Sequence, residues 1–148
     1  MKLRTSLAAA GAAVVLGTTG AFVLPAVASA HATTHTLKFI AVQKAMVSFT
    51  TATVGTQETD INTAGKTVGF DMLYFAVTSA SSAAVNVTVD TKGGFLYGKM
   101  SFNLKTGAVT NGKVTGGTGA FVGATGTIKA KALNKTGTRH AVTITYSG

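Results

Sequence analysis

The sequence predicts an all-β domain, an eight-stranded antiparallel barrel, preceded by the helix of a signal peptide. Apolar and polar residues alternate along most segments after residue 36, and glycine stands in nearly every gap between them. No stretch of a dozen residues there has apolar positions at helical spacing. Seven or eight strands without a covering helix must stack as a sandwich or close into a barrel, because open edges invite aggregation. Closure is the expectation for a small domain without disulfides.

The first thirty residues have the pattern of a signal peptide. Lys2 and Arg4 form a charged start, residues 7–24 are apolar and almost uncharged, and Ala28-Ser29-Ala30 supplies the small side chains that a signal peptidase accepts. Cleavage after the second of these alanines would leave 31–148 as one secreted, extracellular domain with no stable membrane insertion. The alternative is an uncleaved anchor, since the apolar run approaches the roughly 20 residues that cross a bilayer.

The strongest strand pattern covers residues 67–78, where Val68, Phe70, Met72, Tyr74 and Ala76 alternate with Asp71, Leu73, Phe75 and Val77. This segment is expected to be a central strand. Residues 53–66 are polar and hold two glycines, which predicts a long connection or a pair of short edge strands. Further strands are expected at 36–49, 85–90, 95–104, between the turns at 106–107 and 111–112, at 125–133 and at 138–146.

Composition excludes several classes of site. The chain has no cysteine, so it can form neither a disulfide nor a thiolate metal site, and its three histidines are His31, His35 and His140. We therefore expect no metal and no cofactor. The formal net charge is +9, but the lysines are scattered through every segment. That distribution favours solubility and loose attraction to anionic envelope polymers over a nucleic-acid surface.

Few residues could carry acid–base chemistry. Glu58 and Asp60 lie in the polar segment and are expected to be solvated. Asp71 interrupts the most apolar strand, so it is either paired by a base or solvated at the start of its face; if it is buried, its pKa would rise and make it a candidate acid. His140 alternates with apolar residues in the last strand, which fits a core or rim histidine as well as a catalytic one.

One glycine-rich run resembles a family signature. Residues 114–128, VTGGTGAFVGATGTI, resemble a motif of the allene oxide cyclase and dirigent superfamily, and residues 64–69 and the long first strand look like its secreted actinobacterial members. The resemblance implies an eight-stranded antiparallel barrel with an apolar cavity. It implies an isomerase-like activity in which a snug pocket enforces ring closure, and association into dimers or trimers. Plant cyclases carry glutamates in the first strand, where residues 39–44 offer only Gln43 as a polar substitute.

Two functions follow as hypotheses. The first is a secreted barrel that encloses a small hydrophobic molecule and steers its cyclisation, with Asp71, Gln43 and His140 as polar or catalytic groups. The residues expected to line its compartment are Phe39, Phe70, Met72, Tyr74, Phe95, Tyr97, Phe102, Phe121 and Tyr146. The second is a non-catalytic structural or envelope-associated protein whose side chains fill the barrel. A homo-oligomeric carrier is a further alternative.

Overall fold

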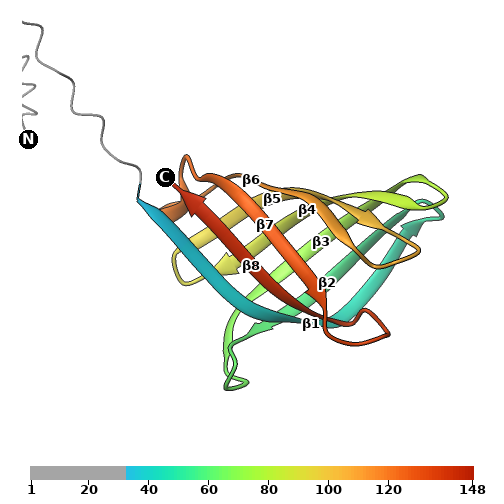
Figure 1. Cartoon of the computed structure of the whole chain (residues 1–148), viewed down its shortest axis with the longest axis horizontal. Coiled ribbons are helices and arrows are strands. Elements are labelled where there is room, and N and C mark those ends of the chain that lie inside the picture. The colour runs from blue at the N-terminus through green and yellow to red at the C-terminus, as the bar shows by residue number, and fades with distance from the viewer. Residues whose placement is uncertain (1–32) are drawn as a thin grey trace, which may run out of the picture. The chain divides into compact units, whose positions relative to one another are not determined.

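The computed structural model describes residues 33–148, and the predicted signal peptide lies outside this range. The described residues form a closed antiparallel barrel in which each strand pairs with the next and β8 pairs with β1 (Figure 1). Its elements are β1 (Thr34–Thr50), β2 (Thr53–Ile61), β3 (Thr67–Ser79), β4 (Ser82–Thr91), β5 (Gly94–Asn103), β6 (Val109–Gly117), the 3-10 helix η1 (Gly119–Phe121), β7 (Thr125–Ala132) and β8 (Arg139–Ser147). The predicted eight-stranded barrel is confirmed. Over these residues there is no helix with the length and apolar character to traverse a membrane.

The segment 53–66 differs from the prediction. Its first nine residues form β2, a full strand that pairs with β1 on one side and β3 on the other. A full strand was not expected because its inward-facing positions include Thr56, Glu58 and Asp60, so its inner face lacks the apolar residues that normally mark a strand. The polarity of this segment therefore marks an unusual interior and not a loop.

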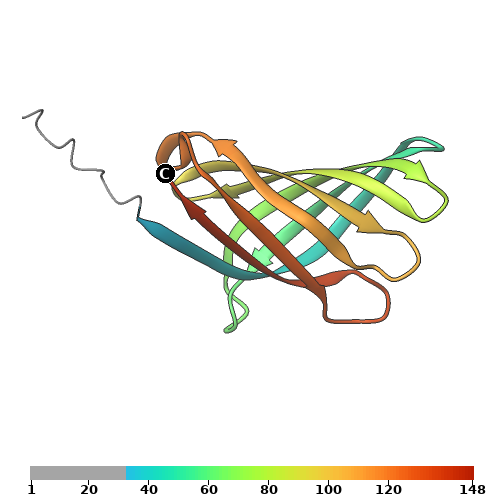
Figure 2. The ribbon, with the colours of Figure 1, turned by 45° about the horizontal axis from the view of Figure 1, so that its top comes forward.

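The two ends of the barrel are built differently. The turns that follow β1, β3, β5 and β7 gather at one end, on the right of Figures 1 and 2, which we call the mouth end. The C-terminus and η1 lie at the other, closed end. There Phe121 is buried and its ring packs edge-on against Tyr146 at a centroid distance of 5.4 Å. The backbone amides of Thr118 and Ala120 donate to the carbonyls of Phe95 and Gly93, which fixes η1 as a plug.

The barrel core lies mainly between this plug and the middle of the strands. Leu96 and Ile144 have no exposed surface, and apolar residues of β4, β5, β7 and β8 surround them. Gly98 faces inward on β5, and a Cβ there would collide with Ile128 Cδ1. Glycine at this position therefore allows Ile128 to extend into the interior. Side chains fill the closed half, and the open volume lies elsewhere.

Candidate functional site

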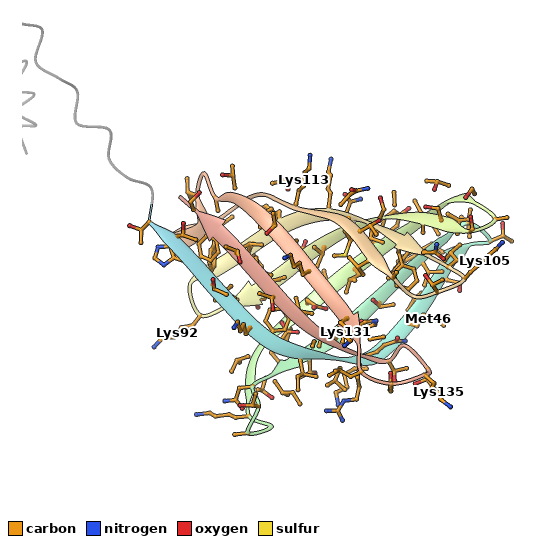
Figure 3. All side chains as sticks on the ribbon, viewed as in Figure 1. Met46, Lys92, Lys105, Lys113, Lys131 and Lys135 are labelled. Carbon is orange, nitrogen blue, oxygen red and sulfur yellow. The ribbon has the colours of Figure 1, made fainter. Side chains whose placement is uncertain are left out.

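The interior holds a cavity of about 250 Å³ to which all eight strands contribute. Its wall is mostly apolar, and Phe75 and Phe102 pack edge to face there with ring centroids 5.5 Å apart. Met46, Leu104 and Gly137 line the part nearest the mouth end, and Figure 3 shows Met46 toward that end of the barrel. The cavity therefore extends from the mouth end toward the middle of the barrel.

Three polar side chains form one row across the cavity wall. Gln43 on β1 is in register with Glu58 on β2, and Glu58 is in register with Asp71 on β3. Residues paired directly across antiparallel strands project from the same face of the sheet. All three side chains line the cavity, together with Thr56 and His140. We call Gln43, Glu58 and Asp71 the polar row.

Asp60 lies beside this row and is almost completely buried, with 1% of its surface exposed. Its register partner on β3 is Gly69. A Cβ on Gly69 would stand 3.4 Å from Asp60 Oδ2 and would collide with the backbone carbonyl oxygen of Asp90. Glycine thus makes space for the Asp60 carboxyl. On its other side, Asp60 is in register with Ala41 on β1, and Ala41 is in register with His140 on β8.

Burial is the largest cause of the raised pKa values of Glu58, Asp60 and Asp71. It raises the pKa of Glu58 from 4.5 to about 8, and the negative charge of Asp71 adds to this rise. Burial also raises the pKa of Asp71, and the charge of Asp60 and the contact with its carboxyl raise it further. For Asp60, burial raises the pKa, while its contact with Asp71 opposes the rise and the charge of Glu58 adds to it. Burial lowers the pKa of His140. At neutral pH the cavity thus holds carboxyls that carry protons and a histidine whose neutral form is favoured.

Several polar atoms at the site have no partner. Within residues 33–148, no hydrogen bond of standard geometry reaches Asp71 Oδ1, Thr56 Oγ1 or either carboxyl oxygen of Asp60, although all four atoms are buried. Such a group costs about 1–3 kcal/mol of folding free energy when it stays unpaired. No Lys or Arg lines the cavity in the described part of the chain. The acids are therefore neither neutralised by a base nor fully hydrogen-bonded.

The described residues contain no group of three His, Cys, Asp or Glu side chains arranged to hold a metal ion. Although Glu58, Asp60 and Asp71 are neighbours on β2 and β3, they do not converge as ligands. What the arrangement offers chemically is a set of protonatable carboxyls in an apolar enclosure.

Five of the residues expected at the site line the cavity, namely Asp71, Gln43, His140, Phe39 and Phe102. Glu58, Asp60 and Thr56 were not expected at the site, because their segment was predicted to be a long connection or a pair of short edge strands with both acids solvated. One pattern could have found them: these residues recur at every second position between Val54 and Ile61, which is the period of a strand. Asp71 is buried, so the solvated alternative for it was wrong.

Another five lie on the outer surface, so their expected place in the compartment is corrected. Phe70, Met72, Tyr74, Phe95 and Tyr97 are between 39% and 60% exposed. Three of these residues belong to the more apolar face of residues 67–78, but the face that carries Asp71 points inward. A prediction from hydrophobicity alone gives the wrong inner face, because the inner face of β3 contains Asp71 and the outer face contains aromatic residues. Met72 and Tyr74 instead border an outer groove on β1, β2, β3 and β4.

The last two expected residues occupy the closed end. Phe121 and Tyr146 pack against each other and against the core, and neither lines the cavity. His35 on β1 stacks on the Tyr146 ring at 5.3 Å. The aromatic residue of the glycine-rich run thus closes the barrel and contributes to the site only by sealing its far side.

The fold and the cavity define a class of protein, a small closed β-barrel with a lumen. No protein-family model matches the sequence, and no curated protein matches it. Solved structures with the same fold include a pyocyanin demethylase, with a TM-score of 0.61 and 15% sequence identity over 76% of this chain and 99% of that chain. At this identity the likeness shows the barrel fold alone.

Proposed function

We propose that this protein is an exported barrel that takes one small, mainly apolar molecule into its lumen and transfers protons to or from it at the polar row. The observation that carries the proposal is the cavity itself, with an apolar wall and buried carboxyls that line one side. Ligand pockets typically combine a predominantly apolar lining with a few convergent polar groups.

The polar row has the properties of a general acid–base site. A catalytic group works best when its pKa lies near the working pH, and burial brings the pKa of Glu58 to about 8. Glu58 and Asp71 can therefore donate a proton at neutral pH and take it back within the same enclosure. The Gln43 amide next to them can orient a polar atom of the ligand. His140, in a position to accept a proton, completes the set of titratable groups on the cavity wall.

Proton transfer to a molecule held in one conformation is the chemistry of an isomerase, including one that directs cyclisation. The resemblance of residues 114–128 to the allene oxide cyclase and dirigent superfamily supports this type of reaction. The name of the pyocyanin demethylase indicates that another barrel of this fold processes a small molecule. Export is supported by the signal-peptide pattern of residues 1–30.

A filled, purely structural barrel is the competing function. The volume of about 250 Å³ and the unpartnered Asp71 and Thr56 atoms favour a lumen that receives a ligand. Lysines on the outer surface, among them Lys92, Lys113 and Lys131 in Figure 3, are compatible with envelope association in either case.

A matched pair of variants on β4 tests ligand entry. Val85 is buried and lines the cavity, whereas its neighbour Ala84 is exposed on the outside. Native mass spectrometry with a panel of apolar aromatic compounds and lipids should show one bound molecule per barrel. Val85→Phe should reduce binding strongly, and Ala84→Phe should not change it. The proposal fails if no compound binds or if Val85→Phe binds like the unmodified protein.

A further inference from the structure

We infer that the lumen is built for an apolar aromatic molecule that carries a cationic nitrogen, held with its positive charge against Glu58 and Asp71. This inference rests on the proposed function, because it names the ligand class of the same cavity. The argument starts from charge. The chain has four Asp and Glu residues in all, and three of them, Glu58, Asp60 and Asp71, are buried together at this site.

No cation of the protein compensates these acids. Among the described residues that line the cavity there is no Lys or Arg, and the one base there is His140. Burial favours the neutral form of His140, so it does not supply a lasting positive charge either. An ionised carboxylate in an apolar environment needs an opposite charge or several hydrogen bonds to be tolerated. The partner that the protein does not provide can come from a ligand.

The unpartnered atoms show where such a ligand would be recognised. Asp71 is 4% exposed, its side chain lines the cavity, and its Oδ1 has no hydrogen-bond partner within residues 33–148. Glu58 is 5% exposed and lines the cavity beside it. A cationic nitrogen placed between the two carboxylates would interact with both, whereas a neutral apolar molecule would leave Asp71 Oδ1 unpaired.

The rest of the wall selects an aromatic cation over a hydrated inorganic one. Phe39, Phe75 and Phe102 line the cavity, and aromatic ring faces attract organic cations. A small inorganic ion would lose its water shell without gaining enough ligands. An N-alkylated heteroaromatic ring loses little hydration and can pack against these rings. The aromatic wall and the polar row thus both favour an aromatic organic cation as the ligand.

Binding of a permanent cation should be linked to proton release. Because burial raises the pKa of Glu58 to about 8, the acid carries a proton at neutral pH and must lose it to pair with the ligand. The titratable groups that face the row are Asp60 from β2 and His140 from β8. Gln43, the member of the row on β1, and Val89, which pairs with Asp71 from β4, do not titrate. Affinity should therefore rise with pH, by up to about tenfold per pH unit below pH 8.

The test compares two probes of nearly identical shape, 1-methylquinolinium and 1-methylnaphthalene, which differ by a cationic nitrogen in place of a ring carbon. Isothermal titration calorimetry from pH 6 to pH 9, in two buffers of different ionisation enthalpy, measures affinity and the number of protons released. We expect the cation to bind at least tenfold more tightly than the neutral probe at pH 9 and to release protons at pH 7. The affinity of the neutral probe should not increase with pH.

Three variants locate the effect. Asp71→Asn and Glu58→Gln each remove one charge and keep the shape, so each should weaken cation binding at pH 9 by about tenfold or more and spare the neutral probe. Asp90→Asn is the matched control, because Asp90 is the fourth acid and is exposed on β4. It should change neither probe. Retained binding of 1-methylnaphthalene shows that a variant still folds.

The outcomes separate this inference from the proposed function. If the neutral probe binds as tightly as the cation at pH 9, the inference is wrong and the lumen remains a binding site for neutral apolar molecules. If cation binding is stronger but unaffected by both acid variants, the inference is also wrong, because the charge is recognised elsewhere. If neither probe binds, the inference is wrong, and the panel of apolar compounds and lipids then decides whether the proposed function fails with it.

Discussion

Replacing Glu58 by glutamine should make the protein more stable at alkaline pH. Glu58 is 5% exposed, and burial raises its pKa from 4.5 to about 8. An acid whose pKa is raised in the folded state binds more protons folded than unfolded between those two values. The free energy of unfolding must therefore fall as the pH rises through this window. A glutamine side chain would keep the shape of the protonated acid and would not titrate.

The magnitude follows from the linkage relation. One group with this pKa difference removes about 1.4 kcal/mol from the free energy of unfolding for each pH unit well inside the window, and about 4 kcal/mol in total from pH 5 to pH 9. Between pH 7 and pH 9 the loss is about 1.4 kcal/mol, because the slope declines near pH 8. A difference of at least ~2 kcal/mol over the full range is expected.

Urea unfolding of Glu58→Gln and the unmodified protein, followed by circular dichroism at pH 5, 7 and 9, measures this difference. Contributions shared by both proteins, such as that of His140, cancel in the comparison. Asp90→Asn should follow the unmodified protein, since Asp90 is exposed. Parallel stability curves for Glu58→Gln and the unmodified protein from pH 5 to pH 9 would refute the reasoning, and so would a rise in the stability of the unmodified protein from pH 7 to pH 9.

Three further changes test the architecture around the site. Ile144→Ala removes a side chain with no exposed surface and should lower the free energy of unfolding by about 2–5 kcal/mol in urea; a loss below about 1 kcal/mol would mean that this core is loosely packed. Gly69→Ala should destabilise the barrel by about 1–3 kcal/mol, because the new Cβ meets the Asp90 carbonyl oxygen, while a neutral effect would show that β3 can move away from β4. Phe121→Ala should cost about 3–5 kcal/mol and speed amide hydrogen exchange at the closed end, and unchanged exchange there would contradict the role of η1 as a plug.

The barrel could be predicted from the sequence because several of its segments repeat apolar residues at every second position and glycine stands in the gaps between them. Residues 67–78 and 85–90 show that period, and both lie in strands. Phe121, in the glycine-rich run, was expected to line the compartment and is instead buried at the closed end. Strand β2 escaped prediction because two of its buried side chains are carboxyls, and average preferences place carboxyls at the surface.

The candidate site was harder to predict than the fold. Asp71, Gln43 and His140 were expected as polar groups and line the cavity, but the sequence could not show that β1 and β3 are brought to the two sides of Glu58. That arrangement depends on the register of β2, including the shift in pairing after Gln43. The inner and outer faces of β3 were predicted the wrong way round for a related reason. Its aromatic residues point outward, so hydrophobicity alone indicates the wrong face as the inner one.

The position of the acids is costly for folding, which argues that it serves the site. With a formal net charge of +9, the surface would benefit from negative charges, yet three of the four acids lie in the interior. Replacing them with apolar residues of similar size would avoid their desolvation and their mutual repulsion. Stability that a protein forgoes in this way is commonly found where function needs a strained or charged site. If Glu58→Gln is more stable at pH 9 and binds the cationic probe less tightly, the same carboxyl will have been shown to oppose folding and to support binding.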